Sequence, residues 1–226
     1  ALLACERMKH AHALVVTDGV FSMDGDLAPL HALARIAHAH EAWLMSDDAH
    51  GLGVLANGRG SAFADGAKAP IDLQMGTLSK ALGSYGGYLC ASNAVIDLVK
   101  TRARTLIYST GLPPACVAAA LAALDIIEAD PELAGRPLAR AQSFTRACDL
   151  PLAQSPIVPI VMGSEIAALE AQQILERAGF LAIAIRPPTV PAGTARLRLA
   201  FTAGHPDDEI ARLAKLVAAK ILPMKA

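Results

Sequence analysis

Residues 76–83 read Gly-Thr-Leu-Ser-Lys-Ala-Leu-Gly, which sets a lysine among small and hydroxyl residues. An apolar run at 71–75 precedes this stretch, and the pair Gly86-Gly87 leads into a second apolar run at 88–91. Lys80 is therefore expected in a glycine-loosened turn near a strand end, where a ligand can approach the backbone. A lysine amine partly shielded from water there can attack a carbonyl and form a Schiff base. The alternative is an ordinary surface lysine in a turn.

Two further apolar runs are predicted to be strands that end in polar residues. The run at 14–17 ends at Asp18, and the run at 43–46 ends in Asp-Asp-Ala-His-Gly. An amphipathic helix is expected between them, at about 30–40. Strand, helix and strand in this order predict a parallel pair, and ligands bind beyond the carboxyl ends of such strands. The residues expected to meet at this edge are Asp18, Ser22, Asp47, His50, Thr77 and Lys80.

A change of pattern near Asp130-Pro131 predicts two domains. Before it we expect a helix at 93–102, an extended turn at 106–114 and an alanine-rich helix from Pro114 to about Glu128. After it, strands at 157–161, 181–185 and 196–201 alternate with amphipathic helices capped by Ser164 and Asp207. The expected fold class is α/β, with a mostly parallel sheet in residues 1–129 and a small α+β domain in residues 130–226.

Composition excludes several classes of function. Hydrophobic residues make up 54% of the 226 residues, and the formal net charge is −1. We see no basic stripe for nucleic acid and no apolar run of about 18 residues for a membrane span. The four cysteines lack CxxC spacing, and His38 and His40 do not share a helix face, so no metal site is expected. Scattered reduced thiols favour a cytoplasmic protein.

Residues 51–56, Gly-Leu-Gly-Val-Leu-Ala, match the GxGxxA pattern of dinucleotide-binding proteins. That pattern needs a helix directly after it, but a turn cluster follows at 57–60. Lys80 also lacks the glycine spacing of a P-loop. Nucleotide binding is therefore disfavoured.

Five stretches resemble the α-oxoamine synthases, which are pyridoxal-phosphate enzymes of the aspartate-aminotransferase fold (fold type I). They are Thr-Asp-Gly-Val-Phe-Ser-Met-Asp-Gly-Asp (17–26), Asp-Asp-Ala-His-Gly (47–51), Thr-Leu-Ser-Lys-Ala-Leu-Gly (77–83), Tyr-Ser-Thr (108–110) and Arg-Pro-Pro-Thr-Val-Pro-Ala-Gly-Thr-Ala-Arg-Leu-Arg (186–198). The resemblance covers essentially the whole chain. In the family the region before Ala1 supplies several strands and a histidine that stacks on the cofactor. Residues 1–226 alone are therefore expected to bind the cofactor weakly and to turn over slowly or not at all.

The last of these stretches is typical of the biotin-pathway branch of the family. That branch implies condensation of L-alanine with a pimeloyl thioester of coenzyme A or an acyl carrier protein, which gives 8-amino-7-oxononanoate and releases CO2 and the thiol carrier. Two alternatives stay open: a branch resembling 2-amino-3-ketobutyrate ligase, and a non-catalytic fragment that keeps the fold and the dimer surface.

The resemblance implies a role for each residue around the cofactor ring. Lys80 holds pyridoxal 5′-phosphate as a Schiff base and later serves as the proton-transfer base. Asp47 pairs with the pyridinium nitrogen, and its negative charge keeps that nitrogen protonated so that the ring accepts electrons. His50 and Ser22 hydrogen-bond the phenolic oxygen, and His50 also assists as an acid.

The same resemblance implies the contacts to phosphate and substrate. Thr77 binds the phosphate, and Ser109 and Thr110 reach the phosphate of the neighbouring subunit, which implies a homodimer. Arg186 holds the amino-acid carboxylate in a two-pronged contact, and Thr189 contacts the substrate. Separately, strand alternation places Arg198 on the same side as Arg196, from which it could support Arg186.

Overall fold

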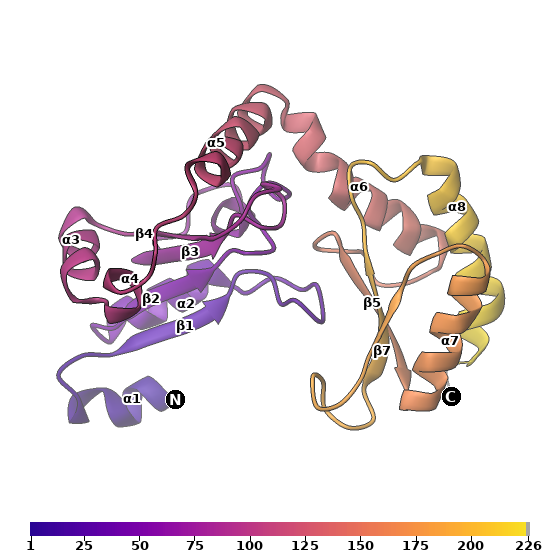
Figure 1. Cartoon of the computed structure of the whole chain (residues 1–226). Helices are drawn as coiled ribbons and strands as arrows, with labels where there is room; N and C mark the ends of the chain where they lie inside the picture. The colour runs from indigo at the N-terminus through magenta and orange to yellow at the C-terminus, as the bar shows by residue number, and fades with distance from the viewer. Residues whose placement is uncertain (225–226) are drawn as a thin grey trace. The chain divides into compact units, whose positions relative to one another are not determined.

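The computed structural model describes residues 1–224, and the chain divides into two compact units. Unit 1 comprises Ala1–Val20 and Leu27–Ala134. Unit 2 comprises the short segment Phe21–Asp26 and the chain from Gly135 onward. The segment Phe21–Asp26 therefore packs with residues far from it in the sequence. Figure 1 labels the elements of both units.

Unit 1 is built on a four-stranded sheet in the order β1-β2-β3-β4. The strands are β1 (Leu14–Asp18), β2 (Trp43–Asp47), β3 (Leu73–Thr77) and β4 (Gly87–Cys90). The first three are parallel and β4 is antiparallel to β3, which confirms the expected mostly parallel sheet. Parallel neighbours bring the carboxyl ends of β1, β2 and β3 to one edge.

The crossover from β1 to β2 runs through α2 (Leu30–Ala39). Its buried alanines Ala34 and Ala37 pack against Leu44 of β2, which is 0% exposed. Small side chains let the helix lie close to the sheet, so this contact holds β2 in place from one face. The neighbouring Trp43 points to the other face and is half exposed.

The remaining helices of unit 1 include the two expected at 93–102 and from Pro114 onward. These remaining helices are α1 (Leu2–Glu6), α3 (Asn93–Arg102), α4 (Arg104–Ile107) and α5 (Pro114–Ala129), with short 3₁₀ turns at Arg7–Lys9 and Ser61–Phe63. Pro114 occupies the first turn of α5, where a missing N–H costs nothing. The extended turn expected at 106–114 was wrong at its start, because Leu106 and Ile107 end helix α4.

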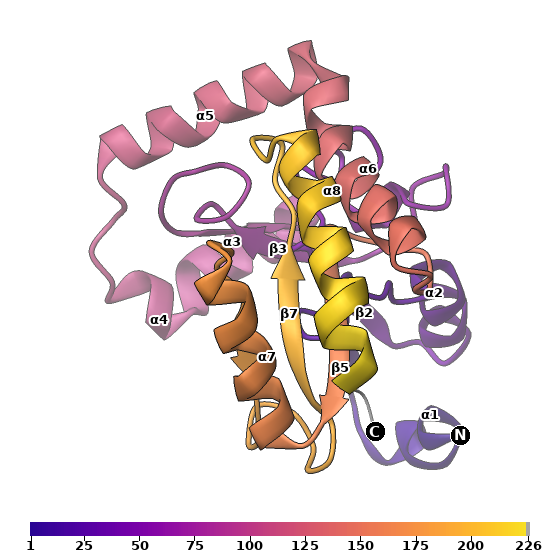
Figure 2. The same cartoon turned by 90° about the vertical axis from the view of Figure 1, so that its right-hand side faces the viewer.

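Unit 2 contains a three-stranded antiparallel sheet in the order β5-β7-β6. Its strands are β5 (Ile157–Gly163), β6 (Ile183–Ile185) and β7 (Ala195–Ala200). Helices α7 (Glu165–Arg177) and α8 (Asp207–Leu216) lie on the same face of this sheet (Figure 2). A π-helical turn at Val217–Ile221 and a 3₁₀ turn at Leu222–Met224 continue α8.

The core of unit 2 forms between these helices and the sheet. Phe144, Ile160, Leu175, Leu197 and Ile221 are each 0% exposed. Phe144 comes from α6 (Pro131–Ala147), which begins in unit 1 and continues into unit 2. No element had been predicted from the sequence for this stretch, whose Pro137 lies inside the helix.

The ends of the helices in unit 2 test two of the predicted caps. The Ser164 hydroxyl accepts the Ala167 N–H at 3.1 Å, as expected, and Gly179 at φ +84° follows the end of α7. Asp207 is not the cap of α8: Pro206 holds that position, and Asp207 is the first helical residue. The Asp207 carboxylate instead contacts Arg140 Nε at 3.1 Å.

Within residues 1–224, none of the helices combines the length and apolar character needed to cross a bilayer.

Candidate active site

The carboxyl ends of the parallel strands bring two of the predicted catalytic side chains together. The Nζ of Lys80 lies 3.0 Å from Nε2 of His50, although the residues are thirty positions apart in the sequence. His50 follows β2 and Lys80 follows β3, and the two strands are hydrogen-bonded neighbours. An amine and an imidazole at this distance share a hydrogen bond whose direction depends on the histidine tautomer.

Asp47, the last residue of β2, is half-buried at the same edge. Its Oδ1 accepts the Ala49 N–H at 2.9 Å, which shapes the turn toward His50. A carboxylate has a second oxygen, which can accept a hydrogen bond from a protonated ring nitrogen. Asp47 is also the register partner of Asp18 on β1.

Asp18 shows that the charges at this edge act on one another. Burial raises the pKa of the Asp18 carboxyl, the negative charge of Asp47 raises it further, and the positive charge of Lys80 opposes both effects. Charges shift one another's pKa at short range, which is consistent with the shared edge of Asp18, Asp47 and Lys80. Three of the residues expected at this edge thus share one electrostatic environment.

Thr77 organises the turn that carries Lys80. Its hydroxyl lies 2.7 Å from the Ser79 hydroxyl, accepts the Ser79 N–H at 3.2 Å and donates to the Gly86 carbonyl at 3.1 Å. Gly86 has φ +110°, and a Cβ there would lie 2.6 Å from a methyl group of Leu112, so only glycine suits this position. The contact between Thr77 and a phosphate stays a prediction.

Ser109 and Thr110 are exposed and follow α4 in unit 1. The Ser109 hydroxyl donates to the carbonyl of Thr105, one turn earlier. Their contact with a second subunit stays a prediction.

Ser22 belongs to unit 2, where arginines of β7 bind its segment. Arg198 Nε donates to the Ser22 carbonyl at 2.5 Å. Arg196, which is 5% exposed, contacts the Asp24 carboxylate and donates to the Met23 carbonyl at 3.4 Å. Burial lowers the pKa of the Arg198 guanidinium. Arg198 was expected to support Arg186, and the contact that the structure gives it is with the segment that carries Ser22.

Arg186 and Thr189 lie in the turn that follows β6 in unit 2. Both side chains are exposed, and the Thr189 N–H donates to the Arg186 carbonyl at 3.0 Å. The turn presents an exposed guanidinium, a group that can bind a carboxylate through two parallel hydrogen bonds. Their contacts with a substrate stay predictions.

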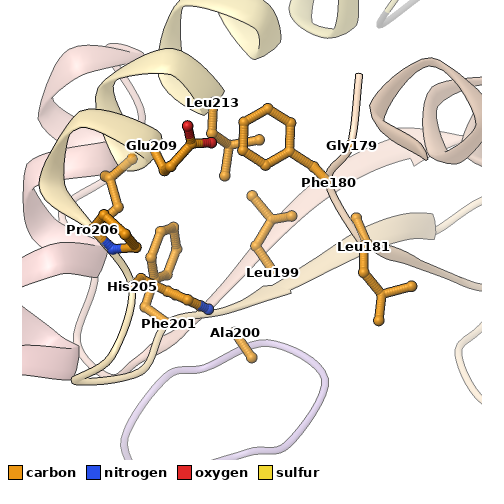
Figure 3. A pocket seen from close by; sticks show the side chains of 12 residues that line it. Gly179, Phe180, Leu181, Leu199, Ala200, Phe201, His205, Pro206, Glu209 and Leu213 are labelled. Atoms are coloured by element: carbon orange, nitrogen blue, oxygen red, sulfur yellow. The ribbon is translucent and has the colours of Figure 1, made fainter. Parts of the chain in front are cut away.

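An apolar cavity of about 300 Å³ lies in unit 2, next to α8 and the end of β7 (Figure 3). Phe180, Leu199 and Phe201 line it, with His205 and Glu209 as polar groups. The candidate catalytic, cofactor and substrate residues do not line this cavity. Its shape is therefore no guide to the chemistry at the sheet edge of unit 1.

The structure adds one residue at this edge that sequence reasoning did not select. Asp48 is 0% exposed and accepts hydrogen bonds from the Ser61 N–H at 3.0 Å and the Gln74 amide at 3.2 Å. The only sequence signal was the doublet Asp47-Asp48, which does not tell which carboxylate is buried. Burial raises the pKa of the Asp48 carboxyl, and the hydrogen bonds from Ser61 and Gln74 lower it in opposition.

The segment after His50 also bears on the rejected dinucleotide motif. Residues 51–59 form successive turns closed by a bridge between Leu52 and Arg59 and by the Gly53 N–H donating to the Gly58 carbonyl at 2.9 Å. The helix that a dinucleotide motif requires is not formed by these residues.

Known proteins resemble the chain in sequence and in fold. The family model for class I and II aminotransferases matches residues 2–217. A protein named 8-amino-7-oxononanoate synthase from Methylocella silvestris is 66% identical over 217 residues, which cover 96% of this chain and 62% of that relative. The chain thus spans less than two thirds of the length of the curated relatives it matches.

Two solved structures share the arrangement of elements. A structure of SPT with a PLP internal aldimine superposes with a TM-score of 0.89 at 29% identity and covers 98% of this chain and 58% of its own. The crystal structure of 8-amino-7-oxononanoate synthase from Francisella tularensis superposes with a TM-score of 0.78 at 27% identity, with coverages of 98% and 67%.

Proposed function

Because the chain belongs to the family of class I and II aminotransferases, we propose that it carries the catalytic residues of a pyridoxal-phosphate-dependent acyltransferase. The reaction is the decarboxylative condensation of L-alanine with a pimeloyl thioester, which gives 8-amino-7-oxononanoate for biotin biosynthesis. The relative that is 66% identical and bears that name supports the choice of reaction. The observation that carries the proposal is the Lys80–His50 pair beside Asp47 at the carboxyl edge of the sheet.

The side chains at this edge suit pyridoxal phosphate. Lys80 offers a primary amine for an aldehyde, Asp47 an acid for a ring nitrogen, and His50 a ring N–H or acceptor for a phenolic oxygen. Thr77 would add a hydroxyl for the phosphate at this edge, and the contact of Ser22, in unit 2, with the phenolic oxygen stays a prediction. When bound, the cofactor supplies an electron-accepting ring that stabilises negative charge at the α-carbon of the amino acid.

Each of the side chains at this edge then has a defined task. Lys80 takes and returns a proton at the α-carbon, and His50, 3.0 Å from the amine, holds that amine in orientation. Asp47 keeps a proton on the ring nitrogen through its negative charge. Asp18 is a second carboxyl near Lys80: burial and the charge of Asp47 raise its pKa, and the positive charge of Lys80 opposes them.

Exposed residues of unit 2 are assigned to the substrate, and exposed residues of unit 1 are assigned to a second subunit. The Arg186 guanidinium would hold the alanine carboxylate through two parallel hydrogen bonds, with Thr189 beside it in the same turn. Ser109 and Thr110 would reach the phosphate site of a second copy, which makes the enzyme a homodimer. We place unit 1 in the large cofactor domain and unit 2 in the small domain. The free thiols of the four cysteines agree with a cytoplasmic location.

The experiment that tests the proposal compares amino acids and acyl thioesters directly. The purified protein with pyridoxal phosphate is given alanine, glycine or serine, each with pimeloyl, acetyl or palmitoyl thioesters of coenzyme A and of acyl carrier protein. Release of CO2 with alanine and a pimeloyl thioester, above every other pair, supports the proposal. A preference for glycine with the acetyl thioester would move the chain to another branch, and no condensation with any pair would favour a non-catalytic fragment.

A further inference from the structure

We infer that Asp48 is a positioning residue that fixes the turn Asp47–His50 relative to Lys80. Asp48 is buried behind this turn and is not among the residues expected to touch the cofactor or substrate. The inference rests on the proposed function, because Asp47 and His50 matter catalytically only if that function holds.

The main chain of Asp48 ties the turn to the neighbouring strand. Its N–H donates to the Met75 carbonyl of β3 at 2.8 Å, and its carbonyl accepts the N–H groups of Gly51 at 3.0 Å and Leu52 at 3.1 Å. These bonds close the turn that contains His50. The residue therefore links the end of β2, the end of β3 and the start of the following loop.

The side chain of Asp48 ties the far end of that loop to the same point. Its Oδ1 and Oδ2 accept the Ser61 N–H at 3.0 and 3.3 Å, and Oδ2 also accepts the Gln74 amide at 3.2 Å. Each of these partners is a donor, so a carboxylate satisfies them where an apolar side chain would leave buried N–H groups unpaired. Loop 51–61 thus returns to the residue from which it departs.

Two glycines show how closely the chain surrounds this carboxylate. A Cβ on Gly51 would lie 2.1 Å from Oδ1 of Asp48, and one on Gly60 would lie 1.9 Å from Oδ2. Both values are far below any van der Waals contact, so a side chain at either position displaces the carboxylate. Gly51 follows His50 directly, and the space that Asp48 occupies therefore determines where the backbone of His50 runs.

A matched control separates a positioning role of Asp48 from a general contribution to stability. Asp72 is another carboxylate of unit 1, and its Oδ2 accepts the Leu44 N–H at 2.8 Å and contacts His38 at 2.9 Å. It supports the start of β2, whereas Asp48 supports the end. Asp72→Ala should weaken the same unit without releasing the turn.

The rate of tryptic cleavage after Arg59 reports how firmly Asp48 holds loop 51–61, and the measurement needs no cofactor. Arg59 is exposed within loop 51–61. Asp48→Ala should raise the rate of cleavage after Arg59 under native conditions by about tenfold or more, because the loop opens locally more often. Asp48→Asn, whose amide oxygen still accepts the Ser61 N–H but whose NH2 group faces the Gln74 amide, should restore part of the protection. Asp72→Ala should cleave after Arg59 at the wild-type rate.

Cofactor affinity and kinetics measure the consequence for the site. Titration of the apoprotein with pyridoxal phosphate should show weaker binding for Asp48→Ala. The loaded protein should lose about tenfold to 100-fold in kcat, since a misplacement of about 1 Å can cost on the order of 100-fold. The KM for alanine should stay within about twofold, because Arg186 is untouched. Asp48→Asn should lie between Asp48→Ala and the wild type in both measurements, because it keeps one of the two acceptor oxygens.

A double-mutant cycle tests the contact between Gly51 and Asp48 itself. Gly51→Ala should weaken pyridoxal phosphate binding in the wild-type background and do so less in the Asp48→Ala background, because the new methyl group then meets only the Ser61 nitrogen, 2.8 Å from the Cβ position, and no longer the carboxylate at 2.1 Å. Equal effects of Gly51→Ala in both backgrounds would contradict the inference. If Asp48→Ala does not fold, Gly51→Ala and Gly60→Ala decide the question, because each brings a methyl group against the Asp48 carboxylate. Wild-type rates of cleavage after Arg59 and wild-type cofactor affinity in both variants would overturn the inference.

The two proposals fail separately. If the wild-type protein condenses its substrates and Asp48→Ala matches Asp72→Ala in cleavage and cofactor affinity, the positioning role is overturned and the function stands. If the wild-type protein binds no pyridoxal phosphate while Asp48→Ala still opens the loop, the tie through Asp48 stands and the proposed function falls.

Discussion

The amine of Lys80 lies 3.0 Å from Nε2 of His50, and neither residue is in a helix or a strand. Each belongs to a turn that follows a parallel strand, and the pairing of β2 with β3 brings the two turns to one edge. The side chains can therefore act on one ligand although the segments that carry them are remote in sequence.

Lys80→Ala should abolish covalent attachment of pyridoxal phosphate. The alanine has no amine to react with the aldehyde, so the visible absorbance band of the loaded protein should disappear. After treatment with borohydride, mass spectrometry should find the cofactor on the peptide that contains Lys80 in the wild-type protein alone. Lys68→Ala, at an exposed lysine of the same unit, is the control and should keep the band. Retention of the band in Lys80→Ala would show that another residue is the anchor.

His50→Ala should lower kcat by about 100-fold or more, which is the lower range for loss of a general acid or base. The amine of Lys80 would also lose the imidazole that lies 3.0 Å away. Steady-state kinetics with saturating thioester measure the change. His38→Ala is a suitable control, because His38 contacts Asp72 on the helix side of the sheet. A kcat near the wild-type value in His50→Ala would remove the imidazole from the mechanism.

Arg186→Ala should weaken the apparent affinity for alanine by about 2 kcal/mol, or roughly 30-fold in KM, the scale of a hydrogen-bonded charged contact. The KM for the thioester should change little, since the guanidinium is assigned to the amino-acid carboxylate. Arg177→Ala removes another exposed arginine of unit 2 and should leave both constants unaltered. An alanine KM that does not move would exclude Arg186 from the substrate site.

Asp24→Ala should lower the free energy of unfolding of unit 2 more than is usual for the loss of an exposed carboxylate. The Asp24 side chain is 56% exposed, but its partner Arg196 is only 6% exposed, so the substitution leaves a buried guanidinium without its carboxylate. A loss of about 1–3 kcal/mol in the free energy of unfolding is expected from an unpaired buried group. Asp26→Ala changes an exposed carboxylate of the same segment and is the control in urea unfolding. Equal losses in the two variants would show that the ion pair contributes nothing.

The stability of the wild-type protein relative to Asp48→Asn should fall as the pH rises. Burial raises the folded-state pKa of Asp48 above its ordinary value of 3.8, so the folded state binds the proton more tightly than the unfolded state. That contribution is fully present below the unfolded pKa and is lost as the pH rises through the folded pKa. Urea unfolding of both proteins from pH 3.5 upward, at intervals of about half a unit, measures the difference. A difference that is flat or grows with pH would contradict the raised pKa.

Much of the architecture was accessible from local signals. The β-branched and apolar runs at 14–17 and 43–46 predicted β1 and β2, because period and composition reflect burial on a sheet. Ser164 marked the start of α7 for an equally local reason, because its side chain caps the helix. Helix α6 escaped prediction because Gly135 and Pro137 lower its intrinsic propensity, whereas packing of Phe144 in the core of unit 2 overrides that propensity.

By itself, the sequence determined the parallel order of strands, the turn that carries Lys80 and the chemical character of Asp47 and His50. These features depend on residues that are neighbours along the chain. Only the tertiary structure decided that Asp48 is buried beneath the turn and that Arg198 contacts the Ser22 segment, which is 176 residues away. Both features depend on contacts between segments that are distant in the sequence. A carboxylate or guanidinium is buried only when such a segment supplies hydrogen-bonding partners that replace water.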